Sequence, residues 1–173
     1  MTLRARRIRQ QAARRRSQRR LFLEQLEDRR VLAANFPEFI DPNPNAGNQF
    51  GHSVVALSTG NVVITSPFDD AGGTDAGAVY LFNGSTGALI STLTGSSAGD
   101  NVGLYGVTAL TNGNYVVGSG NWNNGAAWNA GAVTFGSGTT GVSGVVSAAN
   151  SLVGTTAFDF VGSIGITALT NGN

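Results

Sequence analysis

The segment Val107-Thr108-Ala109-Leu110-Thr111-Asn112-Gly113-Asn114 is the strongest indication of the fold, because variants of it occur twice more in the chain. One variant, Val-Val-Ala-Leu-Ser-Thr-Gly-Asn, begins at Val54, and the other, Ile-Thr-Ala-Leu-Thr-Asn-Gly-Asn, begins at Ile166. The starts at 54, 107 and 166 give offsets of 53 and 59 residues. Self-similarity at such a period indicates a fold built from stacked structural units.

Two other markers recur in the same order as this octapeptide. Residues 75–79 read Asp-Ala-Gly-Ala-Val, and residues 129–133 read Asn-Ala-Gly-Ala-Val. A hydrophobic residue followed by glycine precedes each octapeptide, at 50–51, 102–103 and 161–162. Three markers in one order are not expected by chance. They divide the chain into units at about 49–101 and 102–160 and a partial unit at 161–173.

Each complete unit contains four strand candidates, recognised as clusters of Val, Ile, Thr, Tyr and Phe bounded by Gly, Asn, Asp and Ser. They lie near 53–57, 61–66, 78–83 and 89–93, and near 106–110, 114–119, 132–136 and 145–153. Asn112-Gly113 predicts a two-residue type I′ hairpin turn, which needs positive φ at both positions. We therefore predict an all-β fold of tandem four-stranded antiparallel units, the blades of a partial β-propeller.

The number of units leaves the closure of the fold open. A single blade cannot bury both faces of its sheet, and closed propellers typically use 4–8 blades. This sequence holds two units and the start of a third. Three alternatives follow: a fragment of a longer array, an open solenoid-like stack, or a ring completed by further repeats or by self-association of several chains.

The first unit resembles the FG-GAP repeat of integrin-α-type β-propellers in residues 50–54, 64–67 and 77–82. The second unit has Gly118-Ser119-Gly120 without proline, and it is similar to glycine- and asparagine-rich repeats of large bacterial surface proteins. Many FG-GAP repeats bind calcium between their first two strands. Here that connection, Ser58–Asn61, is short and has no carboxylate, so the resemblance implies no calcium loop.

The N-terminal part of the chain differs from the repeats. All 11 basic residues are arginines between Arg4 and Arg30, and residues 1–34 lack Gly and Pro, which predicts a basic helical leader arm. Residues 35–48 are rich in Pro and Asn and are predicted to be a linker. Residues 23–34 resemble the N-terminal Leu-Glu-Pro-Arg motif of exported bacterial proteins, with Asp28 in place of the proline. This resemblance implies an extracellular or cell-surface location.

Charge and composition exclude several functions for the repeats. No Lys or Arg follows Arg30, while seven acidic residues do, so nothing there can neutralise nucleic-acid phosphates. The chain has no cysteine and no apolar run near the roughly 18 residues that span a bilayer. We therefore expect no nucleic-acid partner and no transmembrane span.

The repeats offer one weak candidate for a metal site. Asp69, Asp70 and Asp75 form the only acidic cluster after Arg30 and could hold a divalent cation. The preferred interpretation is that these side chains cap their own loop, because three scattered acids fall short of a calcium ligand set. His52 is the only histidine and has no titratable partner nearby in the sequence. We expect no cofactor and no catalytic residue.

A second candidate is a ligand-binding face on the loop 121–129. Trp122 and Trp128 flank this loop, and Asn123 and Asn124 lie within it. Aromatic rings beside amides suit stacking on sugars and hydrogen bonding to them. The competing interpretation is packing between blades, since most aromatic residues in repeat sheets belong to the core.

These observations predict a non-catalytic, secreted or cell-surface repeat module for binding, adhesion or structural scaffolding, with a protein or glycan as partner. One alternative is a fragment of a larger surface protein without independent function. Another is an enzyme on a propeller scaffold, such as a polysaccharide lyase or glycosidase, which would need a cluster of acids or bases that the sequence does not display.

Overall fold

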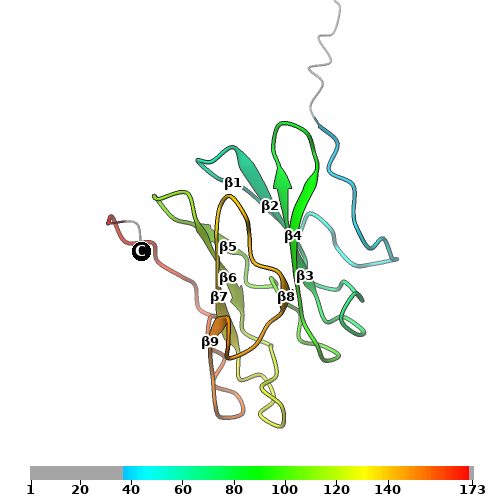
Figure 1. Ribbon diagram of the computed structural model, residues 1–173. Coiled ribbons are helices and arrows are strands. Elements are labelled where there is room, and N and C mark those ends of the chain that lie inside the picture. Colours follow the sequence, from blue (N-terminus) through cyan, green and yellow to red (C-terminus); the bar gives the residue numbers. More distant parts are fainter. Residues whose placement is uncertain (1–36, 172–173) are drawn as a thin grey trace, which may run out of the picture. The chain divides into compact units, whose positions relative to one another are not determined.

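The computed structural model describes residues 37–171, which form two β-sheets (Figure 1). The first sheet has the order β1 (Ser53–Ala56), β2 (Asn61–Ser66), β3 (Ala78–Asn83), β4 (Leu89–Thr94) and β8 (Gly144–Val145). The second has the order β5 (Val107–Ala109), β6 (Tyr115–Ser119), β7 (Ala132–Gly136) and β9 (Ser151–Val153). The predicted all-β fold with a four-stranded antiparallel motif in each unit is confirmed. The predicted helical arm, 1–34, lies outside the described residues.

The predicted fourth strand of the second unit, 145–153, is in fact two strands that join different sheets. β8 pairs in parallel with β4, through Leu93 opposite Gly144, whereas β9 pairs antiparallel with β7. Asn150 explains the break, because its side chain accepts a hydrogen bond from the Ser147 amide and donates one to the Val145 carbonyl. These bonds make a turn between β8 and β9.

The hairpin turns of the two units have the same geometry, which differs from the predicted type I′ turn. In the second unit the Leu110 amide bonds to the Asn114 carbonyl, and the Gly113 amide bonds to the Leu110 carbonyl. Gly113 has a φ of 86°, whereas Asn112 is not among the residues with positive φ. The connection is therefore a three-residue loop with glycine in the left-handed position, which is another common hairpin solution.

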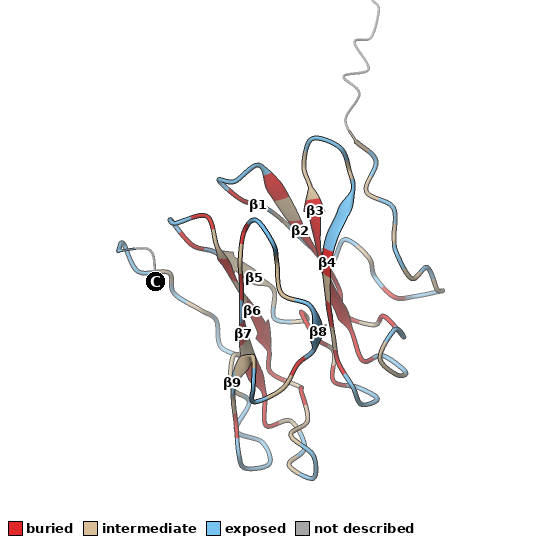
Figure 2. Cartoon of the chain, in the orientation of Figure 1, coloured by how far each residue is buried: buried red, intermediate tan, exposed pale blue. Residues whose placement is uncertain are grey.

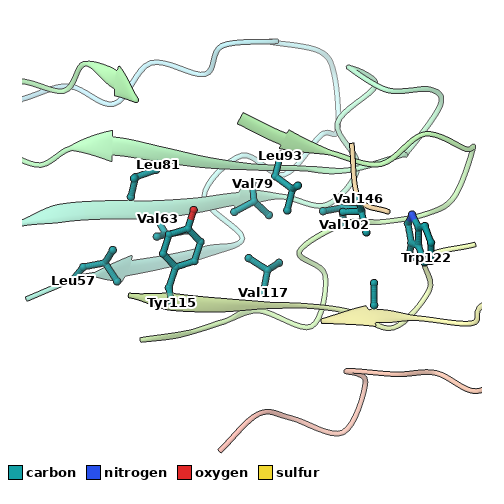
Figure 3. Packing of buried hydrophobic residues seen from close by; sticks show 11 residues of the cluster. Leu57, Val63, Val79, Leu81, Leu93, Val102, Tyr115, Val117, Trp122 and Val146 are labelled. Carbon is teal, nitrogen blue, oxygen red and sulfur yellow. The ribbon is translucent and has the colours of Figure 1, made fainter. Parts of the chain in front are cut away.

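The two sheets pack face to face, and their facing side chains form the main hydrophobic core (Figures 2 and 3). The first sheet contributes Val63, Val79, Leu81 and Leu93, and the second contributes Tyr115, Val117 and Ala132. All seven are almost completely buried. Successive side chains along a strand point to opposite faces, so that one face of each sheet meets the other sheet.

The opposite face of the first sheet is covered by Phe39 from the predicted linker, 35–48, and by Phe50 from the start of the first unit. Phe39 lies against Phe82 with ring centroids 5.4 Å apart, and Phe50 lies 5.9 Å from Tyr80. Asn48 is buried, and its carbonyl accepts a hydrogen bond from the Ser66 hydroxyl. Residues from Pro37 onward belong to the same compact unit as the sheets, so they differ from the expected linker. Their aromatic side chains bury apolar surface that a neighbouring sheet would otherwise cover.

Candidate functional site

The loops at one end of the sheets form a joint between consecutive units, and this joint occurs twice. Between the first two units, the Val102 amide donates to the Ala76 carbonyl at 3.0 Å. The equivalent pair at the next junction, Val161 and Ala130, makes the same bond at 3.0 Å. Gly77 and Gly131 lie so close to the following segment that an added Cβ would be within 2.3 Å of a backbone atom. The recurring glycine in the Asp/Asn-Ala-Gly-Ala-Val marker is therefore explained by this close approach.

Two aspartates occupy equivalent positions in the two joints. Asp100 accepts hydrogen bonds from the amides of Ser96 and Ser97, and Asp159 accepts them from Thr155 and Thr156. Both carboxylates therefore cap the backbone of a turn that recurs in each unit. Asp100 is fully buried and also accepts two hydrogen bonds from Asn123 of the second unit, so it ties the two units together.

The three aspartates proposed as a weak metal site point to different partners. Asp69 is fully buried and accepts hydrogen bonds from the Tyr80 hydroxyl, the Asn43 amide group and the Ala71 backbone amide, at 2.6, 2.8 and 2.8 Å. Asp70 accepts a hydrogen bond from the backbone of Asp75 at 2.8 Å. Among residues 37–171, no three His, Cys, Asp or Glu side chains are grouped so that they could hold a metal ion.

The buried Asp69 carboxylate affects the chemistry of its neighbour. Burial of Tyr80 raises the pKa of its hydroxyl, and the hydrogen bond to Asp69 and the nearby negative charge raise it further. Burial also raises the pKa of Tyr115. Both phenols are held neutral in the core and serve its packing.

The four residues predicted as a ligand face are separated by the structure. Trp122 is buried in the core between the sheets, whereas Trp128 is 69% exposed. Asn123 bonds to Asp100 and to the backbone amide of Asn129, and Asn124 donates to the Gly154 carbonyl at 2.9 Å. Only Trp128 of this set presents a large side chain to solvent.

Two further exposed aromatic residues lie on the neighbouring loop and were missed by the sequence reasoning. Phe158 and Phe160 are exposed, and their rings are 6.0 Å apart. The Phe158 amide donates to the Trp128 carbonyl at 2.8 Å, so the two loops are joined at these residues. A comparison of the units would have found them, because Gly99 and Asn101 occupy their positions in the first unit.

Comparisons with known protein families give three matches along the chain. Residues 38–82 match the FG-GAP repeat, and residues 109–163 match a repeat of unknown function (DUF5650). Residues 17–36 match a model described as Planctomycete extracellular. The protein is extracellular. No curated protein matches the chain.

These matches agree with the division into units. The FG-GAP match covers β1 to β3 together with the residues that cover them, and the second match covers most of the second unit. The extracellular match overlaps the Leu-Glu-Pro-Arg-like segment 23–34, whose role as an export motif stays a prediction. Residues 37–171 contain no helix with the length and apolar character that a membrane crossing needs.

Proposed function

We propose that this protein is a non-catalytic structural module of the cell surface, whose sheets stack in series with further sheets of the same kind. The proposal rests on a comparison of equivalent faces in the two units. Leu81 and Leu93 of the first sheet are fully buried against the second sheet. Their equivalents in the second sheet, Phe135 and Leu152, are 53% and 72% exposed.

The equivalence of these residues follows from strand pairing. Leu93 lies opposite Val79, and Leu152 lies opposite Val133, which occupies the position of Val79 in the repeat. We define the open face as the side of the second sheet that carries Val116, Val133, Phe135 and Leu152. The same side of the first sheet is the one that packs against a neighbour.

The start of the third unit already lies on the open face. The Thr108 hydroxyl donates to the Ile166 carbonyl at 3.4 Å, and Gly162 approaches the side chain of Val133. Residues 161–171 follow the second sheet on the side away from the first sheet (Figure 1). They occupy the position that residues 102–110 hold against the first sheet, where the chain continues into β5. A further sheet stacked here would bury the open face in the same way.

Sedimentation velocity of the full chain over a range of concentrations tests the stacking. Burying one large apolar side chain contributes about 1.5–3 kcal/mol, so the two residues would favour association by about 3 kcal/mol. Because both faces of the first sheet are already covered, copies of the chain can bury the open face only against the open face of another copy. We therefore expect concentration-dependent association of the wild type through its open faces, and its loss in a Phe135→Thr/Leu152→Thr variant. Val54→Thr, which changes an exposed apolar residue of the first sheet, is the matched control and should associate like the wild type. A wild type that stays monomeric at all concentrations would contradict the stacking.

The non-catalytic part of the proposal has its own test. Incubation with neutral and uronic-acid polysaccharides should release no new reducing ends and no unsaturated products. Protein-dependent product formation would instead favour a glycosidase or lyase. The arrangement of carboxylates supports the expected result, since Asp69 and Asp100 are buried and engaged in several hydrogen bonds each.

A further inference from the structure

The second unit carries an exposed aromatic patch that the first unit lacks. We define the aromatic patch as Trp128, Phe158 and Phe160, which are 69%, 63% and 37% exposed and lie on two loops that the backbone bond from Phe158 to Trp128 joins. Trp128 comes from the loop between β6 and β7, and the two phenylalanines follow β9. The patch lies on the loops of the joint described above, whereas Phe135 and Leu152 of the open face lie on β7 and β9.

The joint does not require aromatic residues at these positions. In the first unit the same places are held by Thr74, Gly99 and Asn101, and the backbone bonds are unchanged. The Gly99 amide donates to the Thr74 carbonyl at 3.0 Å, as the Phe158 amide donates to the Trp128 carbonyl at 2.8 Å. The fold of the loops is therefore achieved equally well without the three rings.

Two of the rings stand on backbone positions that disfavour them. Phe158 and Phe160 have φ values of 65° and 50°, and their equivalents Gly99 and Asn101 have values of 76° and 46°. Glycine and asparagine tolerate this left-handed region, whereas bulky residues there are outliers. Strained residues persist where the surrounding structure over-determines them, and they cluster at ligand-binding sites. The side chains therefore have a role that is independent of local folding.

Stacking of a further sheet would leave most of the aromatic patch accessible. The first joint is the relevant comparison, because there the second sheet is already stacked on the first. Thr74 and Gly99 remain exposed there, while Asn101 is partly buried. By the same geometry Trp128 and Phe158 would stay in contact with solvent in a longer array, so the patch is available to a ligand.

The size of the patch indicates a small ligand surface and not a protein. At 150–250 Å² per aromatic side chain and the exposures given above, the rings present about 350 Å² of apolar surface. A stable protein–protein interface needs about 800 Å² on each partner. The faces of one or two sugar rings match the smaller area. Thr155 and Thr156 are exposed on the loop that carries Phe158 and Phe160.

Charge indicates which sugars can bind. Residues after Arg30 carry seven carboxylates and no Lys or Arg, so the repeats repel anionic ligands. We propose that the aromatic patch binds the uncharged pyranose rings of a neutral polysaccharide by stacking on Trp128 and Phe158. This binding goes beyond the stacking of sheets and does not depend on it.

Isothermal titration of the full chain with cellohexaose, chitohexaose and mannohexaose tests this inference. We expect at least one of them to bind the wild type. A Trp128→Thr/Phe158→Gly variant, which restores the residues of the first unit, should bind at least tenfold more weakly. The Phe135→Thr/Leu152→Thr variant of the open face is the matched control and should keep the wild-type affinity. Trp128 is the exposed tryptophan, so bound sugar should also shield its fluorescence from acrylamide.

Folding and binding are distinguished by thermal unfolding of the same variants. Phe158→Gly should not lower the Tm, because it relieves an unfavourable φ. Trp128→Thr alone should also leave the Tm unchanged, because this side chain is exposed, and it should still weaken sugar binding. Binding of none of the three oligosaccharides would overturn the inference, and so would equal binding by the variant. Binding only to acidic polysaccharides or to a protein partner would overturn it as well. Wild-type affinity in a monomeric open-face variant would support the sugar site even if the stacking proposal failed.

Discussion

Leu93 and Leu152 occupy the same position in two copies of one unit, and we predict that their truncation has very different effects on stability. Leu93 on β4 is fully buried between the sheets and lies opposite Val79. Leu152 on β9 lies opposite Val133 on the open face and is 72% exposed. The residue type and the antiparallel cross-strand partner, a valine, are the same in both places. Leu93 differs in that it is buried and that β4 also pairs with β8, whereas β9 is the edge of its sheet, so the comparison measures what a neighbouring sheet and strand add.

The magnitudes follow from the environments of the two side chains. Truncating a fully buried leucine removes its transfer free energy and leaves a cavity, which together cost about 2–5 kcal/mol. We therefore expect Leu93→Ala to lower the free energy of unfolding by about 3 kcal/mol and the Tm by about 10 °C. Leu152→Ala should change the free energy of unfolding by less than about 0.5 kcal/mol, as is usual for exposed positions.

Urea unfolding of the full chain, followed by circular dichroism and by tryptophan fluorescence, measures both effects. The midpoint should fall for Leu93→Ala with an unchanged m-value, and the two signals should give the same transition. The measurement should be made at a concentration where sedimentation shows a monomer, since association would bury Leu152. Equal losses in the two monomeric variants would refute the assignment of a buried and an open face to equivalent sides of the sheets.

Three other predictions concern the polar groups of the core and of the joints. Asp100→Ala should lower the free energy of unfolding by about 3 kcal/mol, and Asp159→Ala by about 1 kcal/mol. The difference is expected because Asp100 is buried and also accepts hydrogen bonds from Asn123, and urea unfolding of the two variants measures it. Because the pKa of Tyr80 is raised in the folded state above the ordinary value of 10.0, the unfolded state loses its proton first as the pH rises. The free energy of unfolding should therefore fall above about pH 10, by up to about 1.4 kcal/mol per pH unit. Urea titrations at several pH values should show a smaller fall for Tyr80→Phe. Neither millimolar calcium nor EDTA should change the Tm. A calcium site filled at 100 times its Kd would instead raise the free energy of unfolding by about 2.7 kcal/mol.

The strands could be predicted from the sequence because their residues repeat with both the unit period and the alternation of a sheet. The predicted ranges 61–66, 78–83 and 132–136 are reproduced as β2, β3 and β7. The failure at 145–153 has a physical reason. Val145 and Val146 have the composition of a strand in either sheet, and only the contact with Thr94 determines which sheet they join. Local propensity carries no information about such a long-range choice.

The candidate site was predicted less well, because composition does not distinguish a buried aromatic residue from an exposed one. Trp122 and Trp128 are six positions apart on one loop, yet only Trp122 enters the core. The informative signal was the difference between the units. Phe158 is not one of the markers that the units share, because the first unit has Gly99 at the same position.

β8 links the two units in a way that bears on how the array holds together. Residues 144–146 belong to the second unit in sequence, but they extend the first sheet, and the buried Val146 donates its amide to the Thr94 carbonyl. In the other direction, Asp100 at the end of the first unit accepts hydrogen bonds from Asn123 of the second unit. Each unit is thus completed by residues of its neighbour, which makes unfolding of one costly for the other. Because these links use backbone groups and buried polar side chains, the loop positions held by Thr74 and Trp128 are free to differ. A series of units can therefore share one structural joint and still present different binding surfaces.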